Sequence, residues 1–170
     1  MRIDLTKLIG TYGAEIPFAG QADLTGEELY GAYPFQSPVE YSGKIVNHLG
    51  VLRLSGTIKT VLNTCCSRCL KPLDILLTAE SDVILSRDAG AEEEEDVFPL
   101  EDNTVEVEDI LVPELILQVD MTYLCREDCK GLCPVCGCDR NETECSCQTK
   151  QIDPRLAALA SLLEKRDGQD

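Results

Sequence analysis

Hydrophobic and polar positions alternate along three stretches in the first half of the chain. Residues 39–45, 52–62 and 73–85 each place an apolar or small side chain at every second position, which is the period of a β-strand with one buried face. His48-Leu49-Gly50 supplies a turn between the first two stretches. The pattern predicts an antiparallel β meander, or a partial barrel, with one face exposed to water.

The period changes to that of a helix over residues 107–119. Its predicted inner face contains Ile110, Leu111, Glu114, Leu115 and Leu117. A helix with such a face can cover the sheet. Pro113 lacks an N–H donor and crowds the preceding turn, so the helix could instead begin near Val112. Residues 3–9 predict a short strand, and residues 89–96 an acidic mobile loop.

A second helix is predicted near the end of the chain. Asp153 is a good N-cap, and Pro154 fits the first helical position. The predicted fold class is therefore α+β: a helix-covered antiparallel sheet in residues 1–124, a cysteine-rich, zinc-ribbon-like segment in residues 125–150, and a C-terminal helix and tail in residues 151–170.

Seven of the ten cysteines lie in residues 125–147, which read CREDCKGLCPVCGCDRNETECSC. Cys133 and Cys136 form a C-x2-C knuckle, and Gly137 permits the tight backbone that follows. A second knuckle, Cys66 and Cys69, lies in the turn between two predicted strands. Two knuckles without an export signal favour a metal over disulfides. Zinc suits four thiolates in a tetrahedron and is the predicted cofactor.

The preferred ligand sets use eight thiols, and Cys65 and Cys138 belong to neither set. One set is Cys133, Cys136, Cys145 and Cys147, and the other is Cys66, Cys69, Cys125 and Cys129. The second set closes a longer loop, at an extra entropic cost of about 1.7 kcal/mol. A structural zinc ion contributes roughly 10–16 kcal/mol, which exceeds that cost.

Two alternatives to these ligand sets stay open. A single site could use Cys125, Cys129, Cys133 and Cys136, in which case the other pairs bind no metal. Cys66 and Cys69 could also be buried thiols without any metal.

The charge of the chain bears on its partners. The formal net charge is −16, which disfavours general binding of nucleic acid. Charge is also unevenly spread, because no acid occurs between positions 41 and 73, whereas thirteen acids and no base occur between positions 88 and 125. The five bases in the first of these regions are Lys44, Arg53, Lys59, Arg68 and Lys71. We therefore expect a polarised molecule.

Little in the sequence indicates catalysis. The only histidine is His48, in a predicted turn away from the cysteines, whereas a catalytic zinc usually has histidine or carboxylate ligands and an open position. The CPVC tetrapeptide resembles a thioredoxin-like redox motif, so a thiol redox protein is an alternative, although that chemistry requires a βαβ setting. No apolar run approaches the roughly 20 residues that span a bilayer. We expect a cytoplasmic protein with no enzymatic activity, small-molecule substrate or membrane partner.

Several motifs together resemble the YceD family of bacteria and plastids. They are CSRCL at residues 66–70, CKGLCPVCG at residues 129–137, the spaced Cys145 and Cys147, and DPRL at residues 153–156. The chain departs from the family pattern at residues 138–141, where CDRN replaces an expected asparagine-rich turn. The resemblance implies a non-enzymatic factor for accumulation of large-subunit ribosomal RNA and assembly of the large ribosomal subunit.

Two modes of action fit this resemblance. In the first, the protein engages ribosomal RNA or a precursor particle through the five bases named above. In the second, it is an acidic binding module or chaperone for a basic ribosomal protein or assembly partner, without direct RNA contact. The zinc-binding segment is a scaffold in this second mode.

Overall fold

The computed structural model of the protein describes residues 1–87, 96–100 and 102–147. The chain forms two compact units. The first, here called the sheet unit, consists of Met1–Cys66 and Lys71–Cys125. The second, here called the cysteine unit, consists of Ser67–Leu70 and Arg126–Asp170, and it is described as far as residue 147.

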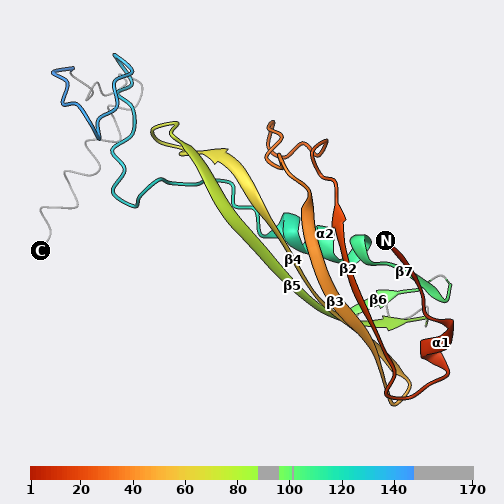
Figure 1. Ribbon diagram of the computed structural model, residues 1–170. Coiled ribbons are helices and arrows are strands. Elements are labelled where there is room, and N and C mark those ends of the chain that lie inside the picture. The colour runs from red at the N-terminus through yellow and green to blue at the C-terminus, as the bar shows by residue number, and fades with distance from the viewer. Residues whose placement is uncertain (88–95, 101, 148–170) are drawn as a thin grey trace, which may run out of the picture. The chain divides into compact units, whose positions relative to one another are not determined.

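The sheet unit is built on a curled five-stranded sheet (Figure 1). The strands in spatial order are β2 (Glu15–Ala22), β3 (Val39–His48), β4 (Val51–Cys65), β5 (Pro72–Ser86) and β6 (Val97–Pro99). Neighbours from β2 to β5 are antiparallel, while β6 runs parallel to β5. The predicted meander of three strands is therefore confirmed as β3, β4 and β5, and β2 and β6 flank it.

One face of the sheet carries the core. Ile45, Leu54 and Ile58 are fully buried there, as their alternation with polar residues predicts. Gly43 and Gly56 lie opposite each other on β3 and β4. A Cβ atom on Gly56 would lie 3.2 Å from a methyl carbon of Leu111. The missing side chain thus lets the helix approach the sheet closely.

The covering helix, α2, spans Val107–Leu117 and contains Pro113 in its interior. The alternative start near Val112 is therefore wrong. Pro113 is exposed. The helix buries Val107, Ile110, Leu111 and Leu115. Leu117 was expected on the inner face but is 76% exposed, so the apolar face of the helix ends at Leu115.

The N-terminal segment departs from the predicted strand. Only Arg2–Asp4 is extended, as β1, and it pairs with β7 (Thr104–Glu106) in a separate two-stranded sheet. Thr6–Ile9 forms a short helix, α1. The Asp4 carboxylate accepts a hydrogen bond from the backbone N–H of Thr6 at 2.8 Å. This is a local contact that competes with a continued strand.

Asn47 joins α1 to the turn between β3 and β4. Its side chain is fully buried. The amide nitrogen donates to the Leu8 carbonyl at 2.7 Å, and the amide oxygen accepts from the Gly50 N–H at 2.8 Å. Leu49 and Gly50 both have positive φ, 53° and 95°, as a two-residue hairpin turn requires. The predicted turn is confirmed at these two positions.

The described part of the cysteine unit contains no named helix or strand, only an isolated bridge between Leu132 and Asp139. The predicted C-terminal helix lies outside the described residues, as does the predicted acidic loop except for Asp96. In the described part of the chain, no helix is both long enough and apolar enough to cross a membrane.

Candidate metal centres

The structure brings eight cysteines together in two groups of four. One group is Cys66, Cys69, Cys125 and Cys129, and the other is Cys133, Cys136, Cys145 and Cys147. Within each group, the sulfur atoms all lie within 4.8 Å of one another. Four converging thiols could bind a metal ion. The groups, here called the first and second tetrads, have the same members as the two sets predicted from spacing.

The second tetrad begins in a tight backbone turn. The Gly137 N–H donates to the Cys133 carbonyl, and the Cys133 N–H donates to the Cys138 carbonyl, each at 2.8 Å. Gly137 has φ +74°, a conformation that favours glycine. The Arg140 N–H donates to the Gly131 carbonyl at 3.0 Å. These bonds point the Cys133 and Cys136 side chains toward a common centre.

Hydrogen bonds shift the pKa values of the thiols in and beside this tetrad in opposite directions. The backbone N–H groups of Cys136 and Val135 lower the pKa of Cys133 to about 6. The backbone N–H and thiol of Cys138 lower the pKa of Cys136. The contact with Cys136 in turn raises the pKa of Cys138 to about 12, and raises that of Cys147 to about 12. Negative charge therefore concentrates on Cys133 and Cys136, the two thiolates of the knuckle.

The first tetrad is more deeply buried than the second. Cys66 is 0% exposed and Cys129 is 3% exposed, whereas Cys136 of the second tetrad is exposed. The Cys66 N–H donates to the Lys71 carbonyl at 2.8 Å across the turn that follows β4. Leu70 in this turn has φ +60°. The two knuckles thus differ in their access to solvent.

Arg68 and Gly131 form a close contact within the cysteine unit. The Arg68 guanidinium donates to the carbonyls of Cys129 and Glu127 at 2.9 and 3.2 Å, and the Arg68 carbonyl accepts from the Leu132 N–H at 2.9 Å. A Cβ atom on Gly131 would lie 2.8 Å from the Arg68 carbonyl oxygen. Arg68, a predicted phosphate contact, therefore has structural hydrogen bonds in this fold.

Asn141 is a functional candidate that spacing did not reveal. Its amide nitrogen donates to the Cys129 sulfur at 3.4 Å and to Asp139 at 2.6 Å. Its amide oxygen accepts from the Lys130 N–H at 2.8 Å and from the Arg126 guanidinium at 2.7 Å. Asn141 lies between Cys138 and Cys145 in the chain, yet it contacts a thiol of the first tetrad. The only sequence signal is the turn-forming Asp-x-Asn at residues 139–141.

Three of the five predicted phosphate contacts are paired with acids on the solvent face of the sheet. Lys44 lies 3.1 Å from Glu15, Lys59 lies 3.2 Å from Glu40, and Arg53 makes a two-point contact with Asp82. The guanidinium of Arg53 lowers the pKa of Asp82. Strand pairing brings these acids from distant positions in the sequence. A neighbouring acid therefore offsets the charge of each of these three bases.

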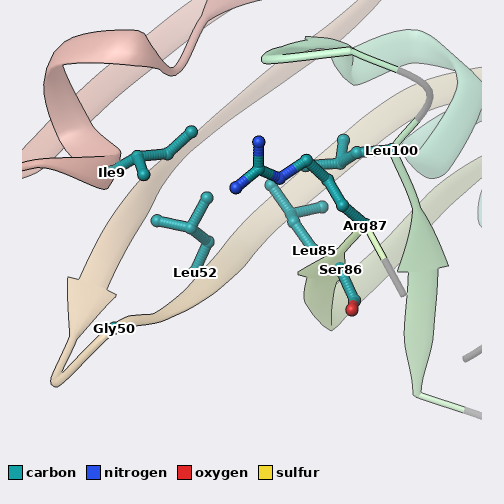
Figure 2. Close-up of a pocket in the computed structure, with 7 residues that line it drawn as sticks. All are labelled: Ile9, Gly50, Leu52, Leu85, Ser86, Arg87 and Leu100. Carbon is teal, nitrogen blue, oxygen red and sulfur yellow. The ribbon is translucent and has the colours of Figure 1, made fainter.

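Figure 2 shows a hollow in the sheet unit, with a volume of about 460 Å³. It is lined by Ile9, Gly50, Leu52, Leu85, Ser86, Arg87 and Leu100. The Arg87 guanidinium lies over the aliphatic side chains and donates to Asn103 at 3.0 Å. Among the described residues that line it, none is a histidine or a carboxylate that could act as a general base.

Comparison with models of known protein families finds a match for this chain. Residues 54–163 match the family model of the large ribosomal RNA subunit accumulation protein YceD. This match covers more than half of the chain, including both tetrads. The chain belongs to the YceD family.

Three relatives illustrate the similarity of the chain to known proteins. The chain is 29% identical over 166 residues to the chloroplastic large ribosomal RNA subunit accumulation protein YCED homolog 1 of Arabidopsis thaliana, covering 78% of this chain and 51% of that protein. The maize homolog is 25% identical, over 72% and 52% of the two chains. An uncharacterised protein of Mycobacterium tuberculosis is 32% identical, over 67% and 56%.

The chain thus spans about half the length of the chloroplastic relatives that it matches. No solved structure matches it significantly. The family name describes a ribosomal RNA accumulation factor rather than an enzyme.

Proposed function

We propose that this YceD protein is a non-enzymatic factor that supports large-subunit ribosomal RNA accumulation and large-subunit assembly by binding a basic protein partner. The family assignment supports the general role. The single observation that supports the mode of action is the pairing of Lys44, Arg53 and Lys59 with acids. Neutralised bases attract phosphate weakly, and the net charge of −16 repels it.

The outer side of α2 and the segment after it offer a surface for such a partner. Asp109 and Asp120 are exposed, and Leu117 and Met121 between and beyond them are 76% and 79% exposed. Acids interspersed with large apolar side chains are complementary to a segment that carries lysine or arginine next to apolar residues. The partner class that this surface favours is a basic extension of a large-subunit ribosomal protein.

The two tetrads are proposed zinc sites. Zinc–sulfur bonds of about 2.3 Å place the sulfurs of a regular tetrahedron about 3.8 Å apart, and the 4.8 Å limit on the sulfur separations in each tetrad is compatible with this spacing. Eight thiolates without a histidine or carboxylate are typical of closed structural sites. Bound zinc would hold the two ends of each cysteine loop together and thereby stabilise the fold.

Association with precursor particles tests the mode of action. Tagged protein is expressed in cells that lack the endogenous copy, and its sedimentation with large-subunit precursors is measured. Asp109→Asn with Asp120→Asn and Leu117→Ser should reduce the bound fraction at least fivefold. The matched triple variant Lys44→Gln, Arg53→Gln and Lys59→Gln should retain it. The opposite pattern would support direct RNA contact through the bases and overturn the acidic-surface mode.

Metal content tests the zinc sites independently. Protein purified without added metal or chelator should contain two zinc ions per chain by elemental analysis. One ion per chain would support the alternative single site from Cys125, Cys129, Cys133 and Cys136. Cys133→Ser would then abolish binding altogether, whereas the two-site arrangement predicts that it removes one ion.

A further inference from the structure

Cys138 brings a fifth thiol against the second tetrad. Its sulfur lies 3.4 Å from the Cys136 sulfur, although Cys138 is not a member of the tetrad. The two cysteines flank Gly137, whose φ of +74° turns the chain back on itself. The hydrogen bond from the Cys133 N–H to the Cys138 carbonyl holds this turn closed. The fold therefore provides five sulfurs for four ligand positions.

Solvent access distinguishes this thiol pair from the other knuckle. Cys136 is exposed and Cys138 is half-buried, so a small oxidant reaches them from water. In the first tetrad, Cys66, Cys69 and Cys129 are buried and Cys125 is half-buried, and no member is exposed as Cys136 is. Oxidation of cysteine depends on exposure as well as on thiolate character. An oxidant should consequently modify the second tetrad before the first.

We propose that Cys136 and Cys138 form an oxidation site at which a hydroperoxide produces a disulfide and releases the metal of the second tetrad. This inference rests on the proposed zinc sites. Loss of the Cys136 thiolate leaves Cys133, Cys145 and Cys147 on the ion. Three remaining sulfurs bind zinc more weakly than four and expose it to competing ligands.

The chemistry balances with hydrogen peroxide as the oxidant. The Cys136 sulfur attacks one peroxide oxygen, the O–O bond breaks, and Cys136 becomes a sulfenic acid while the first water molecule leaves after protonation. The Cys138 sulfur then attacks the Cys136 sulfur, the S–O bond breaks, and a second water molecule leaves after protonation. Two thiols lose two electrons in total, and one peroxide molecule accepts them.

Cys133 is the main competitor for the sulfenic acid, because it forms the C-x2-C pair with Cys136. Its side chain is 2% exposed, and its backbone is held by bonds to Gly137 and Cys138. Cys138 already contacts the Cys136 sulfur and lies outside the tetrad. Attack by Cys138 therefore removes only one ligand from the metal, whereas attack by Cys133 would remove two.

Peptide mapping tests the proposal on the full-length, metal-loaded protein. The protein is treated with hydrogen peroxide, alkylated and digested with trypsin, which releases residues 131–140 with Cys133, Cys136 and Cys138 together. Fragmentation should locate a disulfide between Cys136 and Cys138 with Cys133 alkylated. A chromogenic chelator should detect release of one ion of two. A disulfide between Cys133 and Cys136 would overturn the proposal.

Cysteine variants provide the control. Cys138→Ser should bind two ions, release metal at least tenfold more slowly under peroxide, and accumulate a Cys136 sulfenic acid that dimedone traps. Cys65→Ser, which removes the other cysteine outside the tetrads, should behave as the unaltered protein. Equal release rates in Cys138→Ser and the unaltered protein would refute the role of Cys138. If the untreated protein holds no metal, the zinc proposal fails, and the peptide map still decides the oxidation site.

Discussion

Asn141→Asp tests whether the Asn141 amide supports the Cys129 thiolate of the first tetrad. The substitution keeps the size of the side chain and the acceptor for the Lys130 N–H and the Arg126 guanidinium. It replaces the amide N–H donor that lies 3.4 Å from the Cys129 sulfur and 2.6 Å from the Asp139 carboxylate with an oxygen. At the proposed metal site, a hydrogen bond that offsets charge on the Cys129 thiolate would become a contact between two negative groups, and a second such contact would arise with Asp139.

The expected loss can be estimated from this geometry. Two unit charges 3.4 Å apart repel by about 1.2 kcal/mol in water and by about 5 kcal/mol at an effective dielectric constant of 20. Substitution of a group that orients a metal ligand typically weakens binding by about 10- to 100-fold, or about 1.4–2.7 kcal/mol. The lower part of this range of repulsion energies agrees with that loss of binding free energy. We expect the affinity of the first tetrad to fall by one to two orders of magnitude.

Metal titration with a competing chelator measures the two affinities, and native mass spectrometry counts the ions that remain. At a free zinc concentration that just saturates the unaltered protein, Asn141→Asp should retain one ion. Alkylation should then label Cys129 but not Cys133. The matched control is Asn103→Asp, because Asn103 also accepts a hydrogen bond from a guanidinium, that of Arg87, but lies in the sheet unit.

Two outcomes would refute this reasoning. If Asn141→Asp binds both ions with affinities within threefold of the unaltered protein, the amide does not support the Cys129 thiolate. If both tetrads lose affinity equally, Asn141 acts by folding the whole cysteine unit rather than through Cys129.

Three further predictions concern stability. Asn47→Leu leaves the Leu8 carbonyl and the Gly50 N–H without their buried partner and should cost about 2–4 kcal/mol in urea unfolding; a cost below about 0.5 kcal/mol would contradict this. Gly131→Ala should lower the thermal midpoint more than Gly137→Ala, because both positions have positive φ but only Gly131 lies against the Arg68 carbonyl; equal shifts would show that φ strain alone matters. Tyr41→Phe removes a 2.7 Å hydrogen bond to Glu108 and should cost about 0.5–1.5 kcal/mol at neutral pH. Hydrogen bonds from the N-terminal ammonium and from the Tyr41 hydroxyl lower the folded-state pKa of Glu108. The difference between Tyr41→Phe and the unaltered protein should therefore shrink as acid protonates that carboxylate, and a pH-independent difference between pH 7 and 3 would contradict this.

Alternation of apolar residues predicted the central strands because one face of each is buried. Leu54 and Ile58 follow this rule on β4. Strand β2 was missed because its sequence, EIPFAGQA, contains Pro17 and Gly20 and buries only Phe18 and Ala22 fully. A strand at the sheet edge tolerates a proline, and its pattern is correspondingly weak.

The spacing of the cysteines predicted the two knuckles, because a C-x2-C turn converges by its own local geometry. The preferred partner of each knuckle agrees with the groups in the structure, although local geometry does not determine it. Asn141 could not be recognised in the same way. An amide that supports a thiolate needs no fixed separation from it in the sequence, and residues 129 and 141 come together through the backbone hydrogen bonds of the folded unit. Local motifs are therefore visible in the sequence, while the hydrogen bonds that surround them depend on the folded chain.

The charge pattern of the sequence changes most on folding. Three of the five bases between positions 41 and 73 are paired with acids in the structure, because the strand register sets Glu15, Glu40 and Asp82 beside them. Bound zinc would add no compensation, since four thiolates around a divalent ion carry a net charge of about −2. Under the proposed function, a protein with this surface would act on ribosomal RNA through the basic proteins that bind the RNA. Raising salt should then weaken its association with an isolated basic protein partner, whereas direct RNA binding should be undetectable even at low salt.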